Sequence, residues 1–258
     1  MKFLLHACSF ATVILASSLV PAAPKVLSNC QTIIDPGAYI VGKNVAASGD
    51  CFVIAADNVN LDLDGFVLTG NGTGSAFVEQ LAVGRKGLNL HNGVVTGFAN
   101  GIFMLNSTAM VIDRMQFTNN SSSGVHAGDA VTVTNSQVLD NNGSGIVLGQ
   151  RASVSGCTVN NNAGTGISLN IGSTATGNAV GRNGGTGIFM AEGGLVANSV
   201  SRNNQQYGVL MDCPGTVVSS TVSNNLAFNI AQPGGSGSCD EGGTCCLVIA
   251  HTSTINSF

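Results

Sequence analysis

The sequence has no tryptophan and very little charge. Only 9% of its 258 residues are Asp, Glu, Lys or Arg, and the formal net charge is −4. A helical or coiled-coil protein would need more Leu, Glu, Lys and Ala than this Gly-, Asn-, Ser- and Thr-rich composition provides. The weak negative charge gives no reason to expect nucleic acid or an anionic membrane as a partner. Aliphatic residues that recur at regular intervals argue against disorder.

Residues 1–23 have the layout of a secretory signal peptide. Lys2 precedes an apolar run over 3–20, and small residues offer a cleavage site after Ala22 or Ala23. No later stretch reaches the roughly 18 apolar residues of a membrane span. We therefore expect a secreted or periplasmic protein without a membrane span.

Seven cysteines follow this segment, and an exported protein can keep disulfides. Cys30 and Cys51 bracket a short segment just before the repeats described below, and we predict that they pair. The spacing of the last cysteines does not match a tetrahedral zinc site, so we predict no metal and no cofactor. The connectivity of Cys213 is open, and its possible partners are Cys239, Cys245 and Cys246.

One pattern returns every 21 residues through the second half of the chain. A fixed interval of this kind indicates a solenoid in which each repeat is one coil. Glycine holds one position, namely Gly124, Gly145, Gly166, Gly187 and Gly208, and an aliphatic residue follows it each time. Asparagine holds another, namely Asn120, Asn141, Asn162, Asn183, Asn204 and Asn225.

Apolar residues alternate with polar ones inside each repeat, which is typical of half-buried strands. Two further columns with the same interval begin at Ile112 and Phe117, so each coil carries three short strands. The second column is interrupted at Ser201, where Val200 suggests a slip of one residue. Asparagine tolerates the left-handed backbone of a sharp corner, and stacked amides can bond from coil to coil. We therefore assign the asparagine column to the scaffold and predict an all-β, single-stranded parallel β-helix.

The segment GDCFVIAADNVNLDLDGFVLTG, the following GLNLHNGVVTGFANGIFM and the 21-residue repeats resemble the right-handed parallel β-helix proteins of the pectin-lyase-like superfamily. The opening NCQTIIDPGAYIVGKNV resembles exported bacterial members of the NosD-related type. The resemblance implies a right-handed β-helix over 51–230, an entry segment over 24–50 and a cysteine-containing cap over 231–258. It does not imply one activity, because the superfamily includes lyases, hydrolases, esterases, epimerases and proteins with no assigned reaction.

The known enzymes of this superfamily have sequence signatures that are absent here. The paired DD, NTD, GHG and RIK segments of polygalacturonases do not occur, nor do the R-x-P-x-x-R segment of pectate lyases and the DPHE segment of alginate epimerases. Nine Lys and Arg residues also seem few for holding a long polyuronate. These absences favour a protein that binds without catalysis.

One cluster of ionisable residues remains in the early coils. If the motifs LDLDG and LNLHN belong to consecutive coils with Leu63 on Leu90, Asp64 lies under His91. The motif MVIDR then puts Asp113 on the other side of the histidine. A histidine between two carboxylates can act as a general acid or bind a metal. We take these three residues as candidate catalytic groups, with a purely structural cluster as the alternative.

Four further residues are candidates for substrate binding around this cluster. Asp62 and Arg114 flank it in the sequence. The irregular segment 71–86 lengthens the early coil to 27 residues and brings Arg85 and Lys86 into the neighbourhood. Insertions on one face of a solenoid commonly wall a binding surface.

Two hypotheses of function follow. The first is a non-catalytic exported β-helix that binds polysaccharide or cell-envelope glycan on a long flat face. The second is a polysaccharide lyase or epimerase that acts through Asp64, His91 and Asp113.

Overall fold

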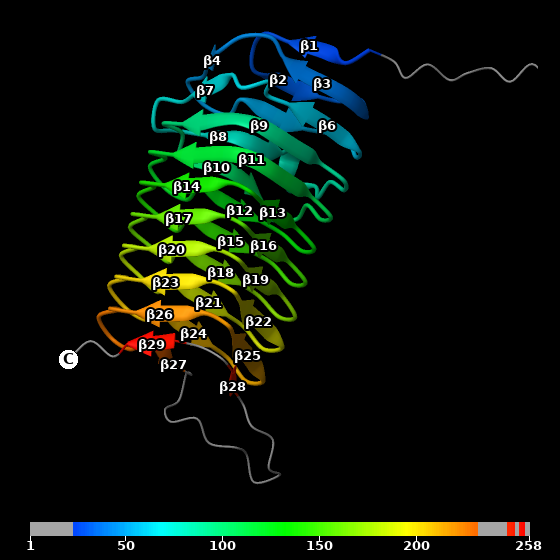
Figure 1. Ribbon diagram of the computed structural model, residues 1–258. Coiled ribbons are helices and arrows are strands. Elements are labelled where there is room, and N and C mark those ends of the chain that lie inside the picture. The colour runs from blue at the N-terminus through cyan, green and yellow to red at the C-terminus, as the bar shows by residue number, and fades with distance from the viewer. Residues whose placement is uncertain (1–22, 232–246, 251–252, 256–258) are drawn as a thin grey trace, which may run out of the picture.

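The computed structural model describes residues 23–231, 247–250 and 253–255. The chain winds into a stack of coils, each built from three short parallel strands (Figure 1). The predicted all-β parallel β-helix is confirmed, and Ile146 pairs with Ile167 at the expected interval of 21 residues. Among the described residues the only helix is a single 3-10 turn, η1 (Gln80–Ala82), and no helix is long and apolar enough to cross a membrane.

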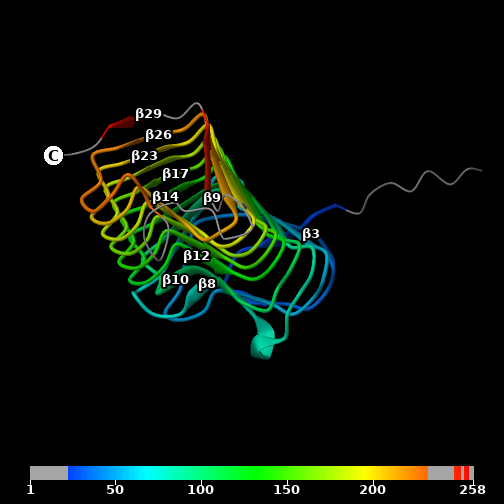
Figure 2. The same ribbon diagram turned by 90° about the horizontal axis from the view of Figure 1, so that it is seen from below.

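Strands of successive coils stack into three ladders around a common core (Figure 2). The first ladder contains β1 (Lys25–Leu27), β3 (Gly37–Val41), β6 (Val59–Asp62), β9 (Asn89–Thr96), β11 (Val111–Thr118), β13 (Thr132–Thr134), β16 (Ser153–Ser155), β19 (Thr174–Thr176), β22 (Gly194–Ala197), β25 (Gly215–Val218) and β28 (Leu247–Ala250).

The second and third ladders complete each coil. The long strands β9 and β11 belong to both the first and the second ladder. The second ladder also contains β4 (Val45–Ala46), β7 (Val67–Thr69), β14 (Gln137–Leu139), β17 (Thr158–Asn160), β20 (Ala179–Gly181), β23 (Val200–Arg202), β26 (Thr221–Ser223) and β29 (Ser253–Ile255). The third contains β2 (Gln31–Ile33), β5 (Phe52–Ile54), β8 (Ser75–Glu79), β10 (Asn100–Met104), β12 (Val125–Ala127), β15 (Ile146–Leu148), β18 (Ile167–Leu169), β21 (Ile188–Met190), β24 (Val209–Met211) and β27 (Ile230–Ala231).

Pairing of the strands extends beyond the expected limits of the β-helix, residues 51 and 230. β1 already pairs with β3 in the entry segment. After the last described third-ladder strand, β28 pairs with β25 and β29 pairs with β26. The expected signal peptide (apart from Ala23) and Cys239, Cys245 and Cys246 lie outside the described residues.

The core consists of the predicted inward columns. The column that begins at Ile112 is completely buried at every coil to Val217. The second column continues through Ser201 without a slip, because Ser201 pairs in register with Val180 and Val222. The slip expected at Val200 was therefore wrong. The serine is tolerated in the core because its hydroxyl donates a hydrogen bond of 2.6 Å to the carbonyl oxygen of Gly208.

Buried asparagine side chains form a ladder along the corner between the second and third ladders, which we call the asparagine corner. Asn162 is typical: its Oδ1 accepts from the backbone N–H and the amide of Asn141, at 3.1 and 2.9 Å. Its own amide donates to the carbonyl of Val138 and to Asn183. Glycine follows in each repeat because space is short: a Cβ on Gly145 would lie 2.6 Å from the carbonyl oxygen of Gly166 and 2.9 Å from the Asn162 amide.

The left-handed residue of this corner lies one position before the ladder asparagine. Our expectation that the ladder residue itself takes this conformation was wrong, because the amide must point inward to bond with the adjacent coils. The preceding residue makes the turn and leaves its side chain outside. These positions, with φ from +54° to +57°, are Asn119, Asp140, Asn161, Arg182, Asn203 and Asn224.

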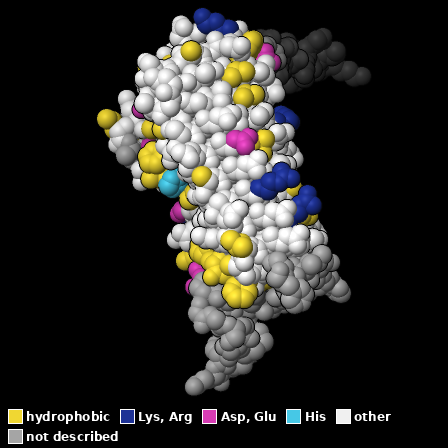
Figure 3. Space-filling view, turned by 90° about the vertical axis from the view of Figure 1, so that its left-hand side faces the viewer, with side chains coloured by type: hydrophobic (Ala, Val, Ile, Leu, Met, Phe, Trp, Pro, Cys, Tyr) yellow, Lys and Arg dark blue, Asp and Glu magenta, His cyan; other side chains and the backbone are white. Residues whose placement is uncertain are grey.

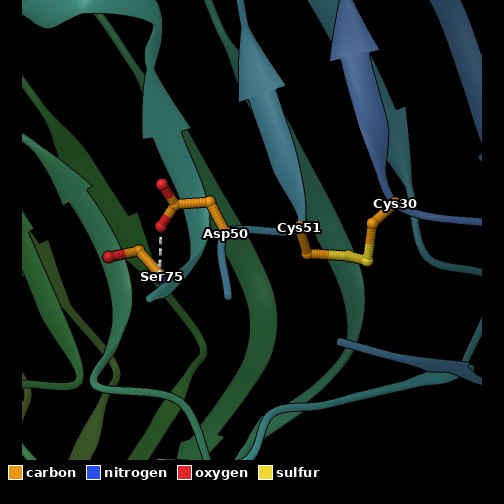
Figure 4. The surroundings of a disulfide bond; sticks show 4 residues. All are labelled: Cys30, Asp50, Cys51 and Ser75. Carbon is orange, nitrogen blue, oxygen red and sulfur yellow. Dashed lines mark hydrogen bonds between the residues drawn. A yellow bond between two sulfur atoms is a disulfide. The ribbon is translucent and has the colours of Figure 1, made fainter. Parts of the chain in front are cut away.

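The predicted disulfide between Cys30 and Cys51 is present (Figure 4). The two residues are 21 positions apart and directly precede β2 and β5, which pair in register. The bond therefore joins adjacent coils at the start of the solenoid. The neighbouring Asp50 accepts a hydrogen bond of 2.7 Å from the backbone N–H of Ser75, which ties this coil to the next one.

Replacing one ladder asparagine should destabilise the whole stack. In Asn162→Ala, the buried N–H and amide of Asn141 lose their acceptor, and we expect a loss of about 3 kcal/mol in the free energy of unfolding. Urea unfolding followed by circular dichroism measures the change. The matched control is Asn142→Ala, because Asn142 is exposed at the same corner. Equal midpoints for the two variants would show that the ladder contributes little.

Removing the disulfide should destabilise the N-terminal coils. The Cys30→Ala/Cys51→Ala variant should lose about 3 kcal/mol, the loop-entropy contribution for a closed loop of this length. Peptide mapping of the unreduced protein should recover the two cysteines in one linked fragment. Alkylation of either residue without prior reduction would contradict the pairing.

Candidate functional site

The structure puts Asp62, rather than Asp64, next to His91. Asp62 of β6 pairs with His91 of β9, and His91 pairs with Asp113 of β11. Asp64 is exposed in the turn after β6, where φ is +49° and its backbone N–H donates to Asp62 Oδ1 at 2.7 Å. The expected stack therefore exists with a different first member.

The difference in register arises from an extra-long turn. Asp62 pairs across an interval of 29 residues, whereas Val67 pairs with Val94 across 27. The turn 63–66 thus contains two residues more than the segment at the same place in the next coil. Aligning Leu63 with Leu90 applied the interval found after the turn to the strand before it.

His91 is held from both sides by protein groups. Its Nδ1 lies 3.6 Å from Asp62 Oδ2, within ion-pair distance, and its Nε2 lies 3.1 Å from Asn60 Oδ1. The ring points outward while its neighbour Leu90 is fully buried. With both nitrogens directed at acceptor oxygens, neither is free to take a proton from a substrate.

Asp113 is also fully occupied. Its Oδ1 accepts hydrogen bonds from Asn135 at 2.9 Å and Thr134 at 2.8 Å, and its Oδ2 lies 3.2 Å from the Arg114 guanidinium. The Asn135 hydrogen bond, supported by Thr134 and by the charges of Arg114 and His91, lowers the pKa of Asp113 although partial burial opposes this shift. A carboxylate held ionised in this way is a poor proton donor.

The two basic residues of the insertion are engaged elsewhere. The segment that carries them leaves the coil between β8 and β9 and protrudes at η1 (Figure 2). The backbone N–H of Arg85 donates to Ser107 Oγ at 3.0 Å, and that of Lys86 donates to Asp57 at 2.9 Å. Neither contact involves the Asp62–His91–Asp113 cluster.

These contacts make the cluster a self-satisfied polar network on an open face. Arg114 remains 64% exposed and can reach a ligand, while Asp62, His91 and Asp113 are each about three-quarters covered. The shallow hollow above them is lined by Asn60, Asn89, Leu90, His91, Val111, Asp113 and Arg114 and measures about 250 Å³. Among the described residues no group of three His, Cys, Asp or Glu is arranged to hold a metal ion.

Two adjoining hollows at the asparagine corner were not foreseen from the sequence. The first, which we call the arginine hollow, measures about 190 Å³. The second, the asparagine hollow, measures about 430 Å³. Arg182 lines both. The arginine hollow is lined by Asn160, Ala179, Val180, Gly181, Arg182, Val200, Arg202 and Asn203, and the asparagine hollow by Asp140, Asn141, Asn142, Asn161, Asn162, Ala163, Arg182, Gly184 and Gln205.

An aromatic pair lies further along the same corner. The rings of Tyr207 and Phe228 stack with centroids 6.2 Å apart, and Phe228 is 65% exposed. Figure 3 looks onto this side of the molecule and shows a largely polar surface, a group of basic side chains and a hydrophobic patch nearer the C-terminal end. The 21-residue spacing of Tyr207 and Phe228 was the available signal, but no column of outward residues was followed in the sequence.

Solved structures similar to this chain include enzymes that act on polysaccharides. The A-module of mannuronan C-5 epimerase AlgE4 from Azotobacter vinelandii superposes with a TM-score of 0.67 at 16% identity, over 84% of this chain and 66% of the epimerase module. The periplasmic alginate epimerase AlgG superposes with a TM-score of 0.51 at 14% identity, over 83% and 62%. Pectate lyase Pel9A superposes with a TM-score of 0.53 at 16% identity, over 86% and 67%.

These likenesses show the fold, because the sequence identities are low. The chain spans about two thirds of the length of each of these proteins. No curated protein matches the chain. The family model described as the right handed beta helix region matches residues 33–195, which is more than half of the sequence. The chain therefore belongs to the right-handed β-helix family.

Proposed function

We propose that this protein is an exported, non-catalytic glycan-binding β-helix whose binding surface is the asparagine corner. The observation that carries the proposal is the pair of adjoining hollows that meet at Arg182. Amide, guanidinium and carboxylate groups line them, and such groups form hydrogen bonds with sugar hydroxyls. Coils stacked in register repeat these groups along the axis, as suits a polymer with repeating units.

The aromatic pair at the end of the corner supports the same proposal. Stacked rings at Tyr207 and Phe228 present a flat apolar surface beside the polar hollows. Exposed aromatic patches of this kind mark binding surfaces, because their desolvation favours contact with another flat apolar face. The C–H face of a sugar ring has that character.

The similar structures and the disulfide agree with this proposal. The epimerases and the lyase named above act on polysaccharides, as their names state. The Cys30–Cys51 disulfide is typical of an oxidising compartment, as is expected after export. A glycan of the cell envelope or of the surrounding medium would be available to the protein there.

A second candidate function is proton abstraction from a polysaccharide, as in a lyase or epimerase. The in-register series Asp62, His91 and Asp113 favours it, because Asp62 is oriented to hold the imidazole and Arg114 could meet a substrate carboxylate. The contact of His91 Nε2 with Asn60 opposes it, since a base needs a free nitrogen. We therefore place binding first.

Truncation of the aromatic pair should weaken glycan binding. We expect the Tyr207→Ala/Phe228→Ala variant to bind its best oligosaccharide about tenfold more weakly, because aromatic contact residues commonly contribute more than about 1 kcal/mol. A panel of hexasaccharides (oligogalacturonate, oligomannuronate, cellohexaose and xylohexaose) titrated by calorimetry gives the affinities. Phe103→Ala is the matched control, because Phe103 is an exposed aromatic residue on another face. An unchanged affinity in the double variant would exclude the aromatic pair from the site.

Incubation of the protein with alginate and pectate should give no product. Unsaturated ends are detected by ultraviolet absorbance, and epimerisation is detected by proton NMR. Turnover that is abolished in His91→Gln and retained in Asn60→Ala would establish the enzymatic function instead. The second variant frees Nε2 of His91, so it should not be less active than the parent if His91 is a base.

A further inference from the structure

We propose that the arginine hollow is a subsite for the acidic group of a glycan, a carboxylate or a sulfate ester. The inference rests on the proposed glycan-binding function and adds the ligand's chemical class. Its basis is a pair of arginine side chains, Arg182 and Arg202, that flank one depression on adjacent coils.

The depression exists because a glycine interrupts a column of larger outward residues. Asn160 of β17, Gly181 of β20 and Arg202 of β23 pair in register across three consecutive coils. A Cβ on Gly181 would lie 3.3 Å from Asn160 Oδ1 and 3.7 Å from Cγ of Arg202. The missing side chain leaves a space bounded by an amide on one side and the stem of an arginine on the other.

Both arginines are exposed and lack the acidic partners that other arginines have. Arg114 lies 3.2 Å from Asp113, and Arg151 lies 4.0 Å from Asp129. In the part of the chain that the structure describes, neither Arg182 nor Arg202 has a carboxylate within ion-pair distance. Two like charges on adjacent coils repel each other, and an anion between them would remove the repulsion.

The surroundings leave this positive charge largely uncompensated. Among the residues that line the two hollows, Asp140 is the only acidic one, and it lies two coils from Arg182. Arg182 also occupies a left-handed corner position, with φ of +54°, that four of the other five coils fill with asparagine. A long basic side chain is therefore present where the backbone favours a short amide.

The size of the hollow fits one acidic group rather than a whole ligand. Its volume of about 190 Å³ is below the roughly 300–1,000 Å³ of sites that enclose a small molecule. Guanidinium groups match the planar, two-oxygen geometry of a carboxylate, and they also bind sulfate. The sugar ring that carries the acidic group would extend into the asparagine hollow, because Arg182 lines both spaces.

The test compares acidic and neutral hexasaccharides on the full-length protein and on charge variants. We expect hexagalacturonate or a heparin hexasaccharide to bind at least tenfold more tightly than cellohexaose at low salt. This preference should be lost in Arg182→Gln/Arg202→Gln, and it should fall steeply in 0.5 M NaCl, roughly the range in which screening acts over a few ångströms. The matched control, Arg151→Gln, removes an equally exposed arginine and should keep the preference.

The outcomes separate the acidic subsite from the proposed function. A stronger response to hexagalacturonate than to the heparin fragment identifies a carboxylate as the ligand group, and the reverse identifies a sulfate. A preference for acidic glycans that survives in the double variant, or equal binding of acidic and neutral hexasaccharides, overturns the subsite but leaves glycan binding intact. Failure of the parent protein to bind any hexasaccharide overturns both. Unchanged thermal melting of the variants ensures that lost binding is not lost folding.

Discussion

In-register hydrogen bonding between successive coils is the constraint on which the rest of the structure depends. The backbone N–H groups of Val125, Ile146 and Ile167 each donate to the glycine of the next coil at 2.9 Å. Every residue therefore has its counterpart 21 positions away as its nearest neighbour, and like side chains form columns. The asparagine ladder extends the same bonding to side chains, where it satisfies buried polar groups that a sharp corner would otherwise leave without partners.

The buried columns could be predicted because burial imposes a strict pattern on the sequence. A one-residue shift would turn a strand's apolar side chains to solvent, so Ile112 and its successors reveal their register without a structure. The turn after Asp62 could not be predicted, because an exposed turn tolerates two added residues with no apolar signal. The left-handed position of the corner was misplaced by one residue for a related reason: asparagine suits both the left-handed turn and the inward amide bond, and Asn161 and Asn162 occupy both positions in the same coil.

The surface sites were predictable only in part. The composition drew attention to His91 and Asp113, and the structure brings them together, but the contacts with Asn60 and Asn135 that occupy them depend on outward side chains of neighbouring strands. The arginine hollow has no motif at all. It results from Gly181 lying between Asn160 and Arg202, three residues spread over 43 positions whose proximity follows only from the stacking interval.

The disulfide at the first coils gives the solenoid a direction. Each coil contacts only its neighbours, so a stack of this kind loses order from its ends inward. A covalent link between adjacent coils closes one end, because neither of the first coils can peel away alone while Cys30 and Cys51 are joined. Fraying is then confined to the opposite end. During export, the linked coils would be the first to emerge, and they would offer an ordered edge on which each later coil can assemble in register.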